Sequence, residues 1–181
     1  MDFICLIFLT QRRRVSEEKR YKLITASLKT LRLCASESKM ILKEPQTPED
    51  FEKYFELRWR ILRKPWGEPR GSEQDEQEKN AYHIMAIEDN KVIGVARLQF
   101  PEQASAQLRY MAIDENHQGR GIGRAIVAHM EQCAKNNSAE ELFFNARDNA
   151  LGFYEKLGYR FIAKTYLLFD SIQHYKMSKK L

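Results

Sequence analysis

A glycine-rich segment near the middle of the chain constrains its fold more than any other feature. Residues 118–123 read Gln-Gly-Arg-Gly-Ile-Gly and lie between a strand-like run at 108–113 and an apolar-periodic stretch at 122–134. A second strand-like run follows at 141–146. A strand, a helix and a strand in this order form a right-handed crossover, in which the two strands are parallel neighbours. The chain is therefore predicted to contain at least one parallel strand pair.

The other elements predict a mixed sheet around that unit. A helix should begin at Pro48, with Thr47 as its N-cap, and end near residue 63. A short helix is predicted at 149–157, and strands at 41–43, 82–88, 91–100, 107–113, 141–146, 160–168 and 172–178. Short turns such as Asp89-Asn90 make neighbouring strands antiparallel. The predicted fold class is α+β, with a mostly antiparallel sheet, a central parallel strand pair and helices on both faces.

Residues 68–80 are rich in acidic side chains and poor in glycine. They are predicted to form a mobile loop or a short helix over one end of the fold. Acidic runs in loops usually face solvent, although this one would also suit a cationic amine if it faced a substrate.

The distribution of charge argues against a nucleic-acid partner. The net charge of +5 lies in residues 1–39, which contain nine basic and four acidic side chains, whereas residues 40–181 contain 21 of each. A nucleic-acid module carries its basic excess on the folded domain. An integral membrane position is not expected either, because no apolar run reaches the ~20 residues that span a bilayer.

Residues 1–39 are predicted to be a basic N-terminal extension, either helical or disordered, that is dispensable for the domain at 40–181 or a product of an upstream start. Ile24, Leu28 and Leu31 recur there at helical spacing. The basic cluster at 12–14 follows the apolar run at 3–9 instead of preceding it, unlike a signal peptide. Cys5, Cys34 and Cys133 have neither metal-ligand nor redox spacing, so no metal site is expected, and reduced thiols indicate a cytoplasmic protein. Cys133 lies on the apolar stripe of its helix and is predicted to be a core residue.

The glycine turn is suited to bind a phosphate group. Its glycines allow positive φ and bring backbone N–H groups toward an anion, and the helix that begins there adds unpaired N–H groups and the positive end of its dipole. Two common phosphate motifs are excluded. A dinucleotide motif counted from Gly119 would need its last glycine at Arg124, and one counted from Gly121 would need it at Ile126. A P-loop is excluded because no Gly-Lys-Ser/Thr follows the turn.

Together with a second motif, the turn resembles the GNAT acyltransferase superfamily. The family pattern R/Q-x-x-G-x-G/A is matched by Gln118, Gly121 and Gly123, and a later signature is matched by Ala150, Tyr154, Glu155, Lys156, Gly158 and Tyr159. A weaker likeness to the bacterial ElaA-type branch rests on Leu57, Arg58, Ile172, His174 and Met177. The resemblance implies that residues 40–181 are an N-acetyltransferase domain with a GNAT-like fold and acetyl-CoA as co-substrate.

The resemblance also implies where acetyl-CoA binds. The pantetheine arm would pair with a strand end that splays from its parallel neighbour, formed by Met111, Ala112 and Ile113. The pyrophosphate would lie on the backbone of Gln118, Gly119, Arg120, Gly121, Ile122, Gly123 and Arg124. The side chains of Arg120 and Arg124 either add charge there or face solvent. Arg147 stands where the family often has an asparagine near the cofactor, and Asn149 lies two residues later in the predicted site.

Catalysis implied by the resemblance is direct attack of a primary amine on the thioester, in which the amine loses a proton and the thiolate must be stabilised. Tyr154 matches the family tyrosine near the CoA sulfur and is predicted to be the general acid, with Phe153 facing a different way. The strand at 108–113 lacks the glutamate that many members use as a base. The candidate bases are His174, which we rank first, and Glu68, Glu73, Glu76 and His83.

Two functions remain open from the sequence. One is an N-acetyltransferase that modifies a primary amine of a small molecule or protein, and the other is a non-catalytic module that senses a CoA thioester or another phosphorylated ligand. A nucleic-acid role would rest on residues 1–39 alone. A fold resemblance does not specify the acceptor. The protein could be a monomer or a homodimer.

Overall fold

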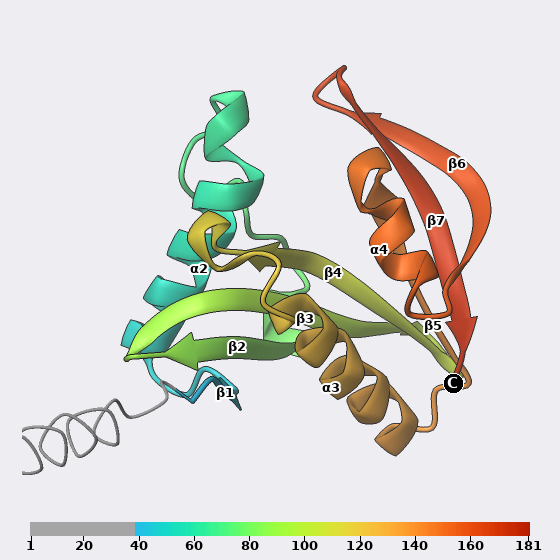
Figure 1. Ribbon diagram of the computed structural model, residues 1–181, viewed down its shortest axis with the longest axis horizontal. Helices are drawn as coiled ribbons and strands as arrows, with labels where there is room; N and C mark the ends of the chain where they lie inside the picture. The colour runs from blue at the N-terminus through green and yellow to red at the C-terminus, as the bar shows by residue number, and fades with distance from the viewer. Residues whose placement is uncertain (1–38) are drawn as a thin grey trace, which may run out of the picture. The chain divides into compact units, whose positions relative to one another are not determined.

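The computed structural model of this protein describes residues 39–181. The predictions for residues 1–38, including the helical spacing of Ile24, Leu28 and Leu31, lie outside the described residues. Residues Met40–Leu181 form a compact unit built on a seven-stranded sheet with the order β1-β2-β3-β4-β5-β7-β6 (Figure 1). The strands are β1 (Ile41–Lys43), β2 (Tyr82–Glu88), β3 (Lys91–Glu102), β4 (Ser105–Ile113), β5 (Glu141–Arg147), β6 (Arg160–Leu168) and β7 (Ile172–Lys180).

Three α-helices accompany the sheet: α2 (Pro48–Leu62), α3 (Ile122–Asn136) and α4 (Leu151–Glu155). Helix α2 begins where the sequence predicts, because Thr47 and Asp50 form a capping box: the Thr47 hydroxyl accepts a hydrogen bond from the Asp50 backbone N–H at 3.1 Å, and the Asp50 carboxylate accepts one from the Thr47 backbone. Of the helices in residues 39–181, none combines the length and apolar character needed to cross a membrane.

The predicted mixed sheet is confirmed. Every neighbouring strand pair is antiparallel except β4 and β5, which are parallel. The parallel register covers three pairs, from Ser105 with Glu141 to Gln107 with Phe143, and then ends. The C-terminal parts of β4 and β5 are therefore not paired with each other, and Figure 1 shows β4 directed away from the β5–β7 group.

Helices cover both faces of the sheet. On one face, Tyr54 and Leu57 of α2 pack against Met85, Val95 and Ala112. On the other face, α3 and α4 pack on a larger core whose strand residues include Ile84, Leu98, Leu108, Leu142, Phe144 and Ala146. Cys133 packs against this second core, as predicted, and its partial burial raises the pKa of its thiol.

A β-bulge separates the two halves of β4. Val95 of β3 pairs with Ala112, whereas Arg97 pairs with Arg109, so β4 contains one residue more than β3 in this interval. Tyr110 has φ 52°, in the left-handed region that few non-glycine residues adopt. Bulges bend a strand and change the direction of its side chains, and they occur often beside functional sites. This bulge lies just beyond the last residue pair between β4 and β5.

The hairpin of β3 and β4 is longer than predicted. Strand β3 continues through Pro101 to Glu102, and β4 begins at Ser105 instead of residue 107. The register is irregular between Gln99 and Glu102, which is where a proline without an N–H can be accommodated. Ala104 closes the turn with φ 62°.

Candidate functional site

A cavity of about 940 Å³ lies between the unpaired ends of β4 and β5. Its walls come from these strands, the glycine turn, α4, the end of α2 and the β6–β7 hairpin. The cavity brings together Tyr154, His174 and all predicted cofactor-binding residues except Arg120, namely Met111, Ala112, Ile113, Gln118, Gly119, Gly121, Ile122, Gly123, Arg124 and Asn149.

The glycine turn presents backbone donors to one end of this cavity. Gly119 and Gly121 have φ 76° and 83°, so both adopt the left-handed conformation that glycine tolerates at little cost. A Cβ atom on either residue would meet nothing within 4 Å, so their requirement is conformational and not spatial. Gly121 is the N-cap of α3 and offers no capping side chain, which leaves the first N–H groups of the helix available to a ligand.

Gly123 serves a different purpose from the other two glycines. A Cβ atom there would lie 3.1 Å from Met111 Cε and 3.2 Å from Phe153 Cζ. These contacts show close packing of the start of α3 against β4 and α4. The turn is thus fixed beside the strand end that forms the next wall of the cavity.

The geometry of the turn and the gap fits a long ligand with phosphate groups at one end. The N–H groups and the helix dipole favour an anion at the turn. Beyond Gln107, β4 has no register partner on β5, so the strand edge of Met111–Ile113 that faces the gap can pair with a ligand.

The side chain of Arg120 is exposed, as in the second of its two predicted roles, and is directed away from the cavity. Its guanidinium forms two hydrogen bonds with the Glu88 carboxylate, at 2.7 and 2.8 Å, and it does not line the cavity. Arg124 does line the cavity and is exposed. Of the two arginines, only Arg124 is placed to add side-chain charge at the turn.

Tyr154 is a core residue that also lines the cavity. It is 8% exposed, and its ring packs 4.1 Å from that of Phe144. The hydroxyl donates a weak hydrogen bond to Met111 Sδ at 3.7 Å. Burial raises the pKa of Tyr154, so the hydroxyl stays protonated and remains a donor. Phe153 also lines the cavity, with its ring 4.8 Å from that of Tyr154, so the prediction that it faces elsewhere is wrong.

His174 lies on β7 directly opposite Arg147 of β5. It is 6% exposed, and its ring stacks on Tyr166 at 4.8 Å. Its Nδ1 lies 3.0 Å from the Ile172 carbonyl oxygen, which only accepts, so Nδ1 carries the proton and Nε2 of the neutral ring is the free acceptor. Burial lowers the pKa of His174, and the charges of Arg147 and Arg63 lower it further.

The other four candidate bases do not line the cavity. Glu73 is buried and accepts a hydrogen bond from the Gly71 backbone N–H at 2.7 Å. A ring nitrogen of His83 lies 2.8 Å from the Glu78 carbonyl oxygen, and burial lowers the pKa of that ring. Glu68 and Glu76 lie on the loop before β2. The structure therefore brings only His174 among the candidate bases into the site.

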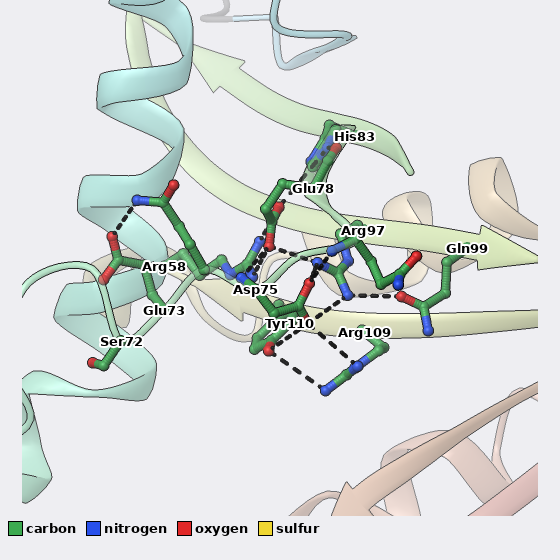
Figure 2. Close-up of polar contacts among 12 residues, drawn as sticks. Arg58, Ser72, Glu73, Asp75, Glu78, His83, Arg97, Gln99, Arg109 and Tyr110 are labelled. Atoms are coloured by element: carbon green, nitrogen blue, oxygen red, sulfur yellow. Dashed lines mark hydrogen bonds and ion pairs between the residues drawn. The ribbon is translucent and has the colours of Figure 1, made fainter. Parts of the chain in front are cut away.

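The acidic segment at 68–80 contains a short 3-10 helix, η2 (Glu78–Asn80), which is one of its two predicted forms, but not all of its acidic side chains face solvent. Figure 2 shows two of its carboxylates directed toward arginines of the sheet and of α2. Glu78 binds Arg58 with both oxygens, at 2.7 and 3.1 Å. Asp75 binds Arg97 and also accepts a hydrogen bond from the Tyr110 hydroxyl at 3.0 Å. Because Arg97 is close, the pKa of Asp75 lies well below its usual range, despite the opposing effect of burial.

These carboxylates are turned inward because the arginines they bind are fully buried. Arg58 and Arg97 are both 0% exposed. The guanidinium carbon of Arg58 lies 3.5 Å from the centre of the Tyr110 ring, on the bulge of β4. Buried charges require partners, and the loop supplies them. The charges of Asp75 and Glu78 are thus used within the fold, and none of the acidic residues at 68–80 lines the cavity.

Sequence reasoning missed the cationic character of the other end of the cavity. Arg63, at the end of α2, and Arg147, at the end of β5, both line it. Arg147 lies 4.6 Å from the ring of Trp66, and Arg63 lies 5.5 Å from the ring of Phe169. The one signal in the sequence was Arg147 at a position where an asparagine was expected.

Comparisons with known proteins agree with this architecture. The model of the acetyltransferase (GNAT) family matches residues 51–159. A Bacillus subtilis (strain 168) protein that is provisionally named an acetyltransferase is 29% identical over 144 residues, covering 78% of this chain and 97% of its own. The uncharacterized N-acetyltransferase YjcF of the same organism is 28% identical, covering 72% and 93%. The crystal structure of a GNAT family acetyltransferase from Elizabethkingia anophelis with acetyl-CoA bound has a TM-score of 0.63 at 17% identity, covering 78% of this chain and 98% of that one.

Proposed function

Because the family model matches more than half of its residues, the chain belongs to the acetyltransferase (GNAT) family, and we propose that it is an acetyl-CoA-dependent N-acetyltransferase acting on a primary amine. The observation that carries this proposal is the continuous cavity from the glycine turn, through the gap between β4 and β5, to Tyr154 and His174. Residues 40–181 would form the catalytic domain.

The binding of acetyl-CoA is proposed from the same geometry. The N–H groups of residues 118–124 would hold the pyrophosphate, and the free edge of Met111–Ile113 would pair with the pantetheine arm. The Elizabethkingia anophelis protein, whose fold this chain shares, has acetyl-CoA bound in its crystal structure. When bound in this cavity, acetyl-CoA would supply the activated thioester.

The chemistry assigned to this chain is the movement of two protons. The amine nitrogen attacks the thioester carbonyl carbon, a C–N bond forms, and the C–S bond breaks. Nε2 of His174 is proposed to accept the proton that the amine loses, directly or through one water. The Tyr154 hydroxyl is proposed to donate a hydrogen bond or proton to the departing sulfur, since burial keeps it protonated. In this structure the hydroxyl donates to a sulfur atom, that of Met111.

Replacing Gly121 with aspartate tests the cofactor site. The variant combines a side chain at φ 83° with a negative charge at the phosphate position, and we expect acetyl-CoA binding to weaken more than about 100-fold. Gly71→Asp is the matched control, since Gly71 also has a positive φ, 97°, and open space, but lies outside the cavity. Calorimetric titration with acetyl-CoA would measure binding, with NADH and ATP as controls for other phosphate ligands. Equal affinity in both variants would contradict the assignment.

The pH dependence of the rate tests His174. Burial lowers the pKa of His174, so the ring stays neutral until the pH falls below the usual histidine value of about 6.5. We therefore expect kcat to fall on the acid side with a midpoint below about pH 6.5. His174→Gln should lower kcat about 100-fold and remove this acid limb. His129→Gln, outside the cavity, should keep the wild-type profile. An unchanged acid limb in His174→Gln would exclude His174 as the base.

A sensor of CoA thioesters would give a different result from an enzyme. Release of free CoA thiol in the presence of acetyl-CoA and a panel of primary amines measures turnover directly. Binding of acetyl-CoA without amine-dependent thiol release would support the sensor and contradict the proposed enzyme.

A further inference from the structure

The cavity has a strongly cationic lining. Its lining includes four arginines and no aspartate or glutamate. Arg124 lies beside the glycine turn, and Arg109 forms an ion pair with Asp75 at 3.4 Å. The remaining two, Arg63 and Arg147, have no carboxylate partner within residues 39–181. Two partly buried cations therefore face this cavity without a counter-charge from the described part of the chain.

This arrangement is unusual within the protein itself. The other buried or partly buried arginines of residues 39–181 all bind a carboxylate: Arg58 binds Glu78, Arg60 binds Glu56 and Asp114, Arg97 binds Asp75 and Glu78, and Arg109 binds Asp75. In these four cases the fold places a carboxylate beside an arginine that is shielded from solvent. Arg63 and Arg147 are the exceptions among the described residues, and both lie in the cavity.

Arg63 and Arg147 lie on the opposite face of the sheet from α3. Along β5, Leu142, Phe144 and Ala146 pack in the core under α3 and α4, so the alternate residue Arg147 faces the other way, toward the α2 side. Arg63 is the C-cap of α2 itself. The glycine turn lies at the start of α3. The two arginines are therefore at the acceptor side of the gap, away from the proposed phosphate site.

Aromatic rings fix the two guanidinium groups without neutralising them. The ring of Phe169, in the β6–β7 hairpin, lies 5.5 Å from the guanidinium of Arg63 and stacks on Trp66 at 6.2 Å. Trp66 in turn lies 4.6 Å from the guanidinium of Arg147. Stacking on a ring leaves the N–H edge of a guanidinium free to bind an anion.

The hydrogen-bonding capacity of this pair is largely unused. The guanidinium of Arg147 makes no hydrogen bond to a described residue. Arg63 donates from Nε to the Ser72 carbonyl oxygen at 3.0 Å and from Nη1 to the Leu62 carbonyl oxygen at 3.2 Å, and keeps Nη2 free. Burial lowers the pKa of Arg147, and the neighbouring charge of Arg63 lowers it further. An anion bound here would gain donors and relieve that repulsion.

We propose that the acceptor is a primary amine that also carries an anionic group, a carboxylate or a phosphate monoester, and that Arg63 and Arg147 bind this group. The inference rests on the proposed function, because it assigns the substrate class of the same site. The anion would anchor the acceptor on the α2 side, with its amine directed to the thioester near Tyr154 and His174. A polyamine or another purely cationic acceptor would be repelled.

Matched acceptors test the inference through turnover. With saturating acetyl-CoA and the full chain, thiol release would be measured for each of the common amino acids against its amide, for phosphoethanolamine against ethanolamine, and for spermidine. We expect kcat/KM to be about 10- to 100-fold higher for an anionic acceptor than for its neutral partner, and preference within one pair identifies carboxylate or phosphate. Arg147→Gln should raise the KM of that acceptor about 10- to 100-fold and leave the KM for acetyl-CoA unchanged. Arg160→Gln, an exposed arginine outside the cavity, is the control.

A measurement without turnover separates this inference from the proposed function. The ring signals of His174, assigned with His174→Gln, would be titrated by NMR in the presence of CoA, with and without inorganic phosphate. Phosphate bound between the arginines should raise the pKa of His174, and Arg147→Gln should abolish this effect.

The combined outcomes are distinct. Acetylation with equal efficiency for anionic and neutral amines, or a rise in the KM for acetyl-CoA in Arg147→Gln, overturns the anion site and leaves the enzyme. Arg147-dependent phosphate binding with no acetylated amine supports the anion site and contradicts the enzyme. No effect of phosphate on His174 overturns the anion site whatever the turnover.

Discussion

Tyr154→Phe is expected to lower kcat about 10²- to 10⁴-fold, the range that a general acid or base contributes, while acetyl-CoA binding stays close to that of the wild type. The substitution keeps the ring that packs against Phe144 and Phe153 and removes only the hydroxyl. Tyr154 lines the cavity, and its protonated hydroxyl is the group proposed to stabilise the departing sulfur. Thiol-release kinetics and calorimetry on the same samples would separate kcat from binding.

Tyr159→Phe is the matched control for this prediction. Tyr159 is also a buried tyrosine, but its hydroxyl donates to Glu131 at 2.9 Å and does not line the cavity. Its loss should reduce stability by about 0.5–1.5 kcal/mol, the contribution of an ordinary hydrogen bond, with kcat unchanged. If both variants kept the wild-type kcat, Tyr154 would not be the acid. If kcat fell equally in both variants, the decrease would reflect impaired folding and not the loss of a catalytic group.

Glu78→Ala is expected to destabilise the protein by about 3–5 kcal/mol, the cost of leaving a buried charge without its partner. Glu78 is the carboxylate that binds Arg58, and it also contacts Arg97. Arg97 would keep Asp75, but the guanidinium of Arg58 hydrogen-bonds to no other described carboxylate, and its Nε is already buried without a hydrogen-bond partner. Denaturant unfolding followed by circular dichroism would measure the change.

Glu49→Ala is the control for Glu78. Glu49 pairs with Lys53 at 2.7 Å, but the two side chains are 74% and 46% exposed. Its removal should change the free energy of unfolding by no more than about 0.5 kcal/mol. A loss below about 1 kcal/mol in Glu78→Ala, similar to that of a surface pair, would show that the arginines rearrange to reach water.

Local features of the fold could be predicted from the sequence because short-range interactions determine them. The capping box at Thr47 depends on residues three positions apart, and the strand runs of β2, β5 and β6 have the apolar patterns of strands. The glycine turn was recognisable because left-handed backbone at Gly119 and Gly121 requires that residue type. The parallel pairing of β4 and β5 followed from chain order alone.

Features that depend on distant partners could not be predicted. Arg97 lies 22 positions from Asp75 and Arg58 lies 20 from Glu78, so nothing in either local sequence shows that these charges meet inside the fold. The bulge at Tyr110 is equally hidden, because tyrosine rarely adopts a positive φ. For the same reason, the inward direction of Asp75 and Glu78 and the cationic end of the cavity could not be predicted.

The break in the sheet has a consequence for the energetics of the whole domain. Because β4 and β5 share only three residue pairs, few backbone hydrogen bonds join the β1–β4 half of the sheet to the β5–β7 half. A ligand bound in the gap would contact both halves of the sheet and would join them for as long as it stays bound. By thermodynamic linkage, its binding free energy would add to the stability of the folded state, so the supply of ligand would also set the protein's resistance to unfolding.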